Sequence, residues 1–355
     1  MKIKQVQNAK LDRCLNLRPE VGQISPRGRG RPSRAEVLRS LDRAIEDLHT
    51  VGGLPLPAEA DAIWEGIWYE EAHHSTAIEG NTLILKEVER LLRDGKAVGS
   101  KELAEYLEVE GYAKAARWVY AQAVEQTRDW SAGERINLTE LRQIHKLVVE
   151  PAWLHSPLDD LRPREGPGSF RQHDIRPFAG GMTPSPFPDV PALVSDWLRD
   201  ADRGPADDQH AMLVVADLHA RFERIHPFRD GNGRVGRLAT NLLLVRHGYP
   251  PAVVYKRDRI RYLNALRRAD RDDAGPLAEI LARAVTDGIH RFLLPGLAGP
   301  HRLVPLRSLA DTELSGNALA VAAKRSRLRA VRRTDQWYST RQWVEDYKER
   351  RYKRG

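Results

Sequence analysis

The chain has a single cysteine, Cys14, among its 355 residues, which excludes an intramolecular disulfide and a zinc site built from cysteines. It lacks any apolar run long enough to cross a bilayer. Its first residues, Met1–Asn8, lack the apolar region of a secretory signal. These absences predict a cytoplasmic protein with no membrane partner. Hydrophobic residues make up 41% of the chain, which is enough to bury a core.

The net charge of +8 is unevenly distributed. Residues 301–355 carry 14 Lys or Arg against 6 Asp or Glu, and residues 1–34 carry 9 against 2. The part between them is therefore mildly acidic. Basic ends of this kind are typical of solvated tails or of contact with a polyanion.

Apolar residues recur at helical spacing through most of the chain, without an alternation of strands and helices, which predicts an all-α fold. Asn137 or Thr139 can cap a helix that begins near Leu138. Only one β-hairpin is expected in the body, within the Pro- and Gly-rich stretch, at residues 169–178. The predicted helices cover about 34–48, 58–77, 85–92, 101–125, 138–148, 191–201, 207–224, 233–245, 258–269 and 276–292.

Composition and periodicity divide the chain into four segments. Residues 1–33 end in a stretch, Ser25–Ser33, in which Gly and Pro alternate with Arg, and this predicts a flexible basic arm. Residues 34–105 form a helical region, residues 106–296 a catalytic core, and residues 301–355 a separate basic domain.

The most informative feature is a run of twelve residues that begins at His226 and ends at Arg237. His226 is suited to accept a hydroxyl proton near neutral pH. Gly231 and Gly233 let the backbone turn sharply before a helix whose N-terminus attracts phosphate. The alternative is an ordinary helix–loop–helix with a packed histidine, but the ordered convergence of so many ligand-type groups disfavours it.

The other polar groups of this run suit a nucleotide polyphosphate. Arg234 and Arg237 lie three positions apart, so that on a helix both can grip phosphate oxygens. Asp230 offers a hard oxygen for Mg²⁺, and Asn232 can donate to a phosphate. Phe228 is expected to plug the loop into the core.

The run resembles the signature of the Fic (Fic/Doc) family, His-x-Phe-x-(Asp/Glu)-Gly-Asn-Gly-Arg-x-x-Arg, at every specified position. The resemblance covers about residues 40–295. After the signature it continues through the region where family members bind the nucleoside, at Arg259, Tyr262, Ala265, Leu266 and Asp270.

The resemblance implies a Fic-type helical core that transfers AMP from ATP to a Ser, Thr or Tyr hydroxyl of a target protein. It implies that His226 deprotonates that hydroxyl, that Asp230 holds Mg²⁺ and that Arg237 meets the γ-phosphate. The remaining nucleotide-binding positions that it implies are Phe228, Gly231, Asn232, Gly233, Arg234 and Tyr262.

Residues Ser75–Gly80 resemble the family's inhibitory motif, Ser/Thr-x-x-x-Glu-Gly/Asn. A Glu79 carboxylate paired with Arg237 would remove that guanidinium from the γ-phosphate and repel the phosphate itself. Ser75, Glu79 and Gly80 are therefore predicted to inhibit the enzyme. The alternative is a helix that ends at a Gly80 cap and leaves Glu79 in solvent.

Residues 169–176 resemble the family's flap, in which exposed backbone pairs with an extended segment of the target. The resemblance implies Arg171, His173 and Ile175 as docking positions. His173 is expected to be a surface residue and not a metal ligand.

The basic segment 301–355 resembles the helix-turn-helix fragments of small excisionase-type or MerR-type DNA-binding domains. Short helices are expected on both sides of a turn at residues 315–317, followed by a two-stranded wing at residues 331–338. Thr340 can cap a last helix. DNA contact through this segment is one interpretation. A basic helical tail that packs on the body or contacts another protein is the other.

The prediction is thus a self-inhibited adenylyltransferase with ATP as substrate, Mg²⁺ as cofactor and a protein target. Removal of AMP, or transfer of another nucleotide or phosphoryl group, stays open as an alternative within the same fold. A DNA-binding regulator that only senses ATP is an alternative of another class. Self-association as a homodimer also stays open.

Overall fold

The computed structural model describes residues 31–122, 133–156, 165–176, 182–333 and 336–352. Residues Arg34–Gly355 form one compact unit, separate from Met1–Ser33. Nearly all of the predicted basic arm, residues 1–30, lies outside the described residues.

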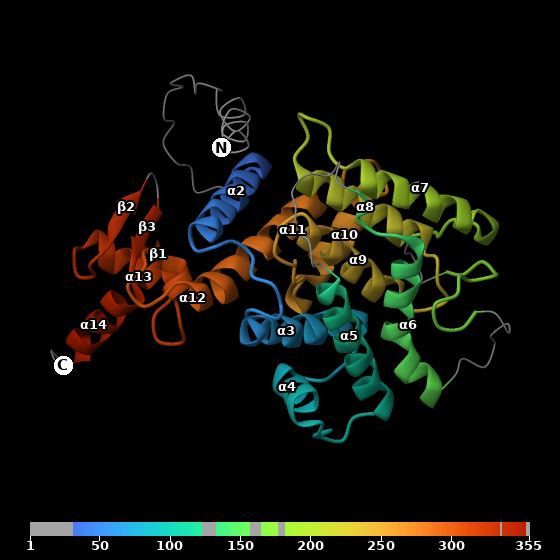
Figure 1. The fold of residues 1–355 in the computed structure, drawn as a ribbon, viewed down its shortest axis with the longest axis horizontal. Helices are drawn as coiled ribbons and strands as arrows, with labels where there is room; N and C mark the ends of the chain where they lie inside the picture. The colour runs from blue at the N-terminus through green and yellow to red at the C-terminus, as the bar shows by residue number, and fades with distance from the viewer. Residues whose placement is uncertain (1–30, 123–132, 157–164, 177–181, 334–335, 353–355) are drawn as a thin grey trace, which may run out of the picture. The chain divides into compact units, whose positions relative to one another are not determined.

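The body is helical, which confirms the predicted all-α class (Figure 1). Two 3₁₀ turns, η1 (Phe187–Asp189) and η2 (Lys256–Asp258), each lead directly into a helix. The α-helices of the body are α2 (Arg34–Thr50), α3 (Asp61–Glu79), α4 (Leu85–Asp94), α5 (Leu103–Ala121), α6 (Leu138–His155), α7 (Val190–Arg203), α8 (Ala211–Ile225), α9 (Asn232–Arg246), α10 (Arg259–Ala269) and α11 (Gly275–Gly288), followed by a π turn, η3 (Ile289–Leu293), and α12 (Leu294–Leu297).

Helix α9 is the central element of the body. It packs against α3, α5, α6 and α8, and nearly every one of its residues is buried (Figure 1). It has no solvent-exposed polar face, so its stability comes from packing on all sides. Apolar residues of α8 and α9 belong to both large core clusters, of which one includes α3 to α7 and the other α2, α10 and α11. The turn between α8 and α9 is therefore held by both clusters.

Asn137, and not Thr139, caps α6. The Asn137 side chain accepts the Glu140 N–H at 2.9 Å, and the Glu140 carboxylate accepts the Asn137 N–H at 3.0 Å. This reciprocal capping box satisfies two of the backbone donors that a helix N-terminus leaves unpaired.

The segment after residue 300 folds on a small core of its own, built from Leu306, Leu314, Leu319, Leu328 and Val344 together with alanines and other partly buried residues. Its elements are β1 (Val304–Pro305), η4 (Leu306–Leu309), α13 (Gly316–Lys324), β2 (Val331–Arg333), β3 (Gln336–Ser339) and α14 (Arg341–Tyr352). The strands form one antiparallel sheet in the order β1-β3-β2.

The predicted wing is confirmed by β2 and β3, and Thr340 caps α14 by accepting the Trp343 N–H at 3.1 Å. The predicted turn at residues 315–317 is wrong. Ser315 is the N-cap of α13, and its hydroxyl accepts the Ala318 N–H at 3.2 Å. The turn lies earlier, at Asp311, whose carboxylate accepts the N–H groups of Glu313 and Leu314 at 2.9 Å. The helix before it is shortened to the 3₁₀ turn η4.

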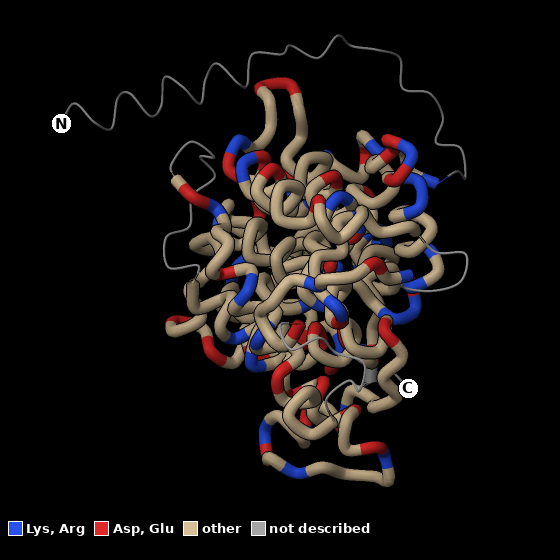
Figure 2. Tube along the Cα trace, turned by 90° about the vertical axis from the view of Figure 1, so that its right-hand side faces the viewer, with Lys and Arg blue, Asp and Glu red and all other residues tan. Residues whose placement is uncertain are grey.

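Lysine and arginine positions alternate with aspartate and glutamate positions over the helices that face the viewer in Figure 2. The body is thus of mixed charge on this side, as its composition predicts. Among the described residues, no helix is both long enough and apolar enough to span a bilayer.

Replacing Asn137 with alanine removes the α6 cap and should lower the free energy of unfolding by about 1 kcal/mol. Thr139→Ala changes an exposed position on the first turn of the same helix and should stay within about 0.5 kcal/mol of wild type. Urea denaturation followed by circular dichroism measures both. Equal losses for the two variants would contradict the assignment of the cap.

Candidate active site

His226 lies immediately after α8 in a left-handed conformation, with φ of 49° and ψ of 60°. Its Nδ1 lies 3.1 Å from the carbonyl oxygen of Glu223. Because a carbonyl oxygen can only accept, Nδ1 carries the ring proton. Nε2 is then the unprotonated nitrogen, available to accept a proton. The ring lines a small pocket of about 90 Å³.

The surroundings of His226 favour the neutral ring. Burial lowers its pKa below the ordinary value of 6.5, and the nearby Arg171 guanidinium lowers it further. The Glu223 carbonyl and the carboxylates of Glu79 and Asp230 oppose this shift without reversing it. The imidazole is therefore a base at neutral pH.

The backbone between His226 and α9 requires two glycines. Gly231 has φ of 79°, and a Cβ there would lie 2.7 Å from a methyl group of Val149. A Cβ on Gly233 would lie 2.4 Å from Oε1 of Glu79. The Glu79 carboxylate thus lies directly against the first turn of α9, where a helix N-terminus favours an anion.

Arg237 joins α9 to α3 through a set of short contacts. Its Nε donates to the Ser75 hydroxyl at 2.7 Å, and its Nη2 donates to the Ser75 carbonyl at 3.0 Å and to Glu79 Oε1 at 2.8 Å. The Arg237 side chain is 6% exposed and that of Glu79 is 41% exposed. The interaction is a charge-assisted hydrogen bond whose cationic side is buried.

Gly80 caps α3 in the left-handed conformation, with φ of 118°. Its N–H reaches the Ala77 carbonyl. Both alternatives foreseen for this motif are therefore partly realised, because the helix does end at a glycine cap while Glu79 still pairs with Arg237.

Helix α3 is anchored one turn before Ser75 by the buried Glu71. Its carboxylate accepts hydrogen bonds from the Tyr112 hydroxyl at 2.8 Å, the Tyr120 hydroxyl at 2.5 Å and the Asn241 amide at 2.7 Å. Burial raises its pKa despite these donors. The network joins α3 to α5 and α9, so the helix that carries Glu79 is fixed to the core.

Two residues that the sequence assigned to the nucleotide have other contacts. The Asn232 side chain accepts the Phe228 N–H at 2.9 Å and donates to the Phe228 carbonyl at 2.8 Å. Phe228 is fully buried and stacks on His145 at 3.8 Å between ring centroids. Both residues hold the loop from inside the protein, and Phe228 is the plug that the sequence predicted.

Asp230 and Arg234 form an ion pair at the mouth of the turn. Arg234 Nη2 lies 2.9 Å from Asp230 Oδ2, and the Asp230 side chain is 64% exposed. The surrounding protein disfavours its charge, but Arg234 and the Gly231 N–H outweigh this effect and lower the pKa of Asp230. The group is a carboxylate at neutral pH, and its side chain is partly open to solvent.

Tyr262 lines the pocket and ends a buried polar chain. The Thr240 hydroxyl donates to the Gly236 carbonyl at 2.8 Å, so the His219 ring donates to Thr240 from Nδ1 at 2.8 Å. His219 Nε2 therefore accepts the Tyr262 hydroxyl proton, at 2.6 Å. Burial lowers the pKa of His219 to about 3, which keeps this ring neutral.

Glu223 is a residue of the pocket that the sequence analysis did not identify. It is 8% exposed, and its Oε1 has no hydrogen-bond partner among the described residues. Burial raises its pKa to about 7. The signal that could have found it is an acidic residue about one turn before His226, on the helix that leads into the run.

The predicted flap residues lie in an irregular loop. The described residues 165–176 contain no strand, and residues 177 and 178 of the expected hairpin lie outside the described part. His173 Nδ1 donates to the buried Glu165 carboxylate at 2.7 Å, and Ile175 is half-buried. Arg171 is 2% exposed and points into the protein, so it does not present a docking side chain.

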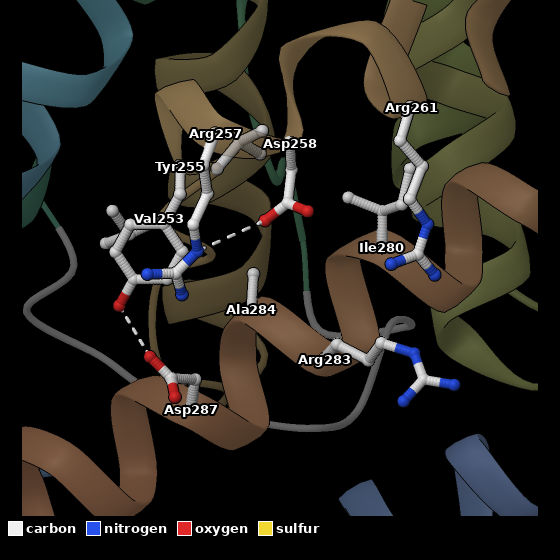
Figure 3. A pocket seen from close by; sticks show the side chains of 10 residues that line it. Val253, Tyr255, Arg257, Asp258, Arg261, Ile280, Arg283, Ala284 and Asp287 are labelled. Atoms are coloured by element: carbon white, nitrogen blue, oxygen red, sulfur yellow. Dashed lines mark hydrogen bonds and ion pairs between the residues drawn. The ribbon is translucent and has the colours of Figure 1, made fainter. Parts of the chain in front are cut away.

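Helix α10 separates the His226 pocket from a second hollow of about 150 Å³. Figure 3 shows Arg257, Arg261 and Arg283 around this hollow together with Asp258 and Asp287. Asp287 accepts the Tyr255 hydroxyl at 2.5 Å. The mixed charges and the open rim give no sign of a selective ligand.

Residues 135–244 match the family model described as Fic/DOC family, the family whose signature the His226 run resembles. Curated relatives named Protein adenylyltransferase Fic are similar to this chain in sequence. That of Drosophila mojavensis is 29% identical over 286 residues, 80% of this chain and 52% of the relative. That of Drosophila melanogaster is 29% identical over 73% of this chain and 48% of the relative. The chain thus spans about half the length of these relatives.

Solved structures have the same fold. Fic-1 of C. elegans (residues 134–508) superposes with a TM-score of 0.58 at 21% identity, over 81% of this chain and 74% of that one. A Fic domain containing signaling protein from Bacteroides thetaiotaomicron gives a TM-score of 0.57 at 22% identity, over 73% of this chain and 96% of that one.

Proposed function

We propose that this protein is an adenylyltransferase that transfers AMP from ATP to a hydroxyl group of a target protein, and that Glu79 inhibits it. The observation that carries the proposal is the Glu79–Arg237 contact of 2.8 Å at the N-terminus of α9, beside a histidine whose Nε2 is free to accept a proton. The name shared by the curated relatives supports the same activity.

The chemistry is a single displacement at phosphorus. Nε2 of His226 accepts the proton of the target hydroxyl as its oxygen attacks the α-phosphorus. The bond between the α-phosphorus and the bridging oxygen to the β-phosphate breaks, and pyrophosphate leaves. The N–H groups at the start of α9 and the guanidinium of Arg234 hold the phosphates, so catalysis is mainly positioning and charge stabilisation.

Asp230 is the residue that fits Mg²⁺ in this site. One exposed carboxylate beside a phosphate cradle matches the way Mg²⁺ binds, through one or two carboxylates together with the phosphates of its nucleotide. Among the described residues no cluster of three or more His, Cys, Asp or Glu could hold a metal alone, so the ion would arrive with ATP. It would neutralise charge on the phosphates.

Inhibition follows from competition for one anion site. The Glu79 carboxylate lies against Gly233 and pairs with Arg237, the two features that would otherwise receive the γ-phosphate. A charge-assisted hydrogen bond is worth about 1.5–3 kcal/mol, so its loss should change the reactive fraction by roughly tenfold to a hundredfold.

Incubation with α-labelled ATP and Mg²⁺ tests the activity and its inhibition together. Glu79→Gly should label itself or an added protein at least about tenfold faster than wild type, because Arg237 is released. His226→Ala in the Glu79→Gly background should abolish labelling. Absence of label from the Glu79→Gly protein would contradict the proposed function.

Two controls separate inhibition from other effects. Glu79→Gln keeps the shape of the side chain but removes its charge, and it should label at an intermediate rate. γ-Labelled ATP should leave no label on protein if AMP is the group transferred. Label from the γ-phosphate would favour phosphoryl transfer, and release of AMP from premodified protein would favour the reverse activity.

We further propose that the segment 301–355 contacts nucleic acid. Residues 314–334 contain Lys324, Arg325, Arg327, Arg329, Arg332 and Arg333 and no acidic residue, and all six cations are exposed. Ala318 and Val321 are exposed on α13, and such short side chains permit close approach to a groove. A dense row of arginines supports phosphate contact first.

Fluorescence anisotropy with labelled duplex DNA tests this second proposal. Replacing both Arg332 and Arg333 with alanine should weaken binding and make the affinity less sensitive to salt. The slope of log affinity against log salt concentration should become shallower by about one for each phosphate that these two arginines neutralise. Glu349→Ala, on exposed α14, is the matched control and should not weaken binding. Undetectable binding by wild type at low salt would contradict the proposal.

A further inference from the structure

The guanidinium of Arg171 is bonded almost entirely to backbone carbonyls. Nε donates to the His226 carbonyl at 2.7 Å and Nη1 to the His173 carbonyl at 3.0 Å. Nη2 donates to the carbonyls of Ser185 and of Ile225, the latter at 3.2 Å. The backbone N–H of Arg171 adds a bond of 2.9 Å to the Pro227 carbonyl. One side chain thus joins three segments of the chain.

These contacts satisfy carbonyls that the fold leaves unpaired. The last carbonyls of a helix have no partner within it, and α8 ends at Ile225. A guanidinium also carries the charge that a helix C-terminus favours. Its five donors in a planar fork match four separate carbonyls, which the three donors of a lysine ammonium cannot do.

The residue held in this way is the proposed base. His226 has a left-handed backbone, which is unfavourable for a residue other than glycine and persists only where the surroundings impose it. Arg171 binds the carbonyls immediately before and at His226, and its own N–H binds the carbonyl immediately after. The orientation of the imidazole is therefore set from both sides.

We propose that Arg171 is a positioning residue, which aims Nε2 of His226 at the incoming hydroxyl and fixes its distance from the docking loop. The bond between Nη1 and the His173 carbonyl supports the fixed distance between His226 and the docking loop, because residues 171–173 belong to the segment expected to receive the target. The inference rests on the proposed function and adds a role that the flap resemblance did not imply.

The charged groups around His226 come from four elements. Arg171 reaches it from the loop, Glu79 from α3 and Asp230 from the turn, and the Glu223 carboxyl from α8 lines the same pocket. Arg171→Lys keeps the positive charge but loses the planar set of guanidinium donors. A change in the rate or pKa of this variant is therefore due to altered geometry and not to a lost charge. If the turn relaxes, the ring gains solvent and its pKa should rise towards 6.5.

The experiment compares Glu79→Gly with Glu79→Gly/Arg171→Lys in single-turnover labelling by α-labelled ATP. We expect the rate of the chemical step to fall at least about tenfold, as it does when a reacting group is misplaced by a fraction of an ångström. The affinity for ATP should change by less than about twofold, since Arg171 does not line the nucleotide pocket. The acid limb of the pH–rate profile should move to higher pH.

Arg199→Lys is the matched control, because Arg199 lies on the exposed face of α7 and pairs only with the nearby Asp196 among the described residues. It should leave the rate unchanged. An Arg171→Lys protein that folds and retains the rate and pH profile of its parent would overturn the proposal. Equal losses of rate and ATP affinity would overturn it too, because they indicate a general structural defect.

A measurement that needs no activity distinguishes failure of this inference from failure of the proposed function. NMR titration of the His226 ring should give a higher pKa in Arg171→Lys than in wild type, whatever reaction the protein catalyses. If the variant does not fold, the test moves to the wild-type protein, where the Nε–H of Arg171 should exchange with solvent at least about a hundredfold more slowly than that of Arg199. Equal exchange rates would overturn the proposal.

Discussion

The proposed inhibition depends on competition between two anions for the N-terminus of α9. The start of this helix presents backbone donors, the positive end of the helix dipole and the guanidinium of Arg237. In this structure the Glu79 carboxylate occupies that position, close enough that a side chain on Gly233 would collide with it. A phosphate that requires the same donors would have to displace it, so in the proposed function the same electrostatics would recognise both ATP and Glu79.

This competition requires that both partners be held firmly. Helix α9 is buried on all sides, and α3 is anchored by the hydrogen bonds of Glu71 to two tyrosines and Asn241. Glu79 is two turns further along α3, at its last residue, and its side chain is partly exposed. Separation of Glu79 from Arg237 would therefore need only a rearrangement of the last turn of α3, while the rest of the helix could stay in place.

The sequence predicted what local pattern determines. Helical periodicity located each long helix of the body, a cap at Asn137 or Thr139 predicted the start of α6, and the wing was visible as a short strand pair. The His226 run indicated a base beside a phosphate cradle. Each of these signals lies within a few neighbouring residues, so no knowledge of tertiary contacts was required.

The errors and omissions concern contacts between distant segments. Arg171 is separated by 55 positions from the His226 carbonyl that it binds. Its sequence neighbours therefore suggested a docking flap and not a residue that holds the backbone at His226. Phe228 is buried as predicted, but the ring on which it stacks, His145, comes from α6, far from it in the sequence. The raised pKa of Glu223 follows from its burial, which one sequence does not reveal.

Calorimetric titration of ATP and of ADP into two proteins, His226→Ala and His226→Ala/Glu79→Gly, tests the competition most directly because neither protein turns over. If Glu79 excludes the γ-phosphate, its removal should tighten ATP binding by at least about tenfold and ADP binding by less than about twofold. Equal gains for the two nucleotides, or no gain for ATP, would contradict the account.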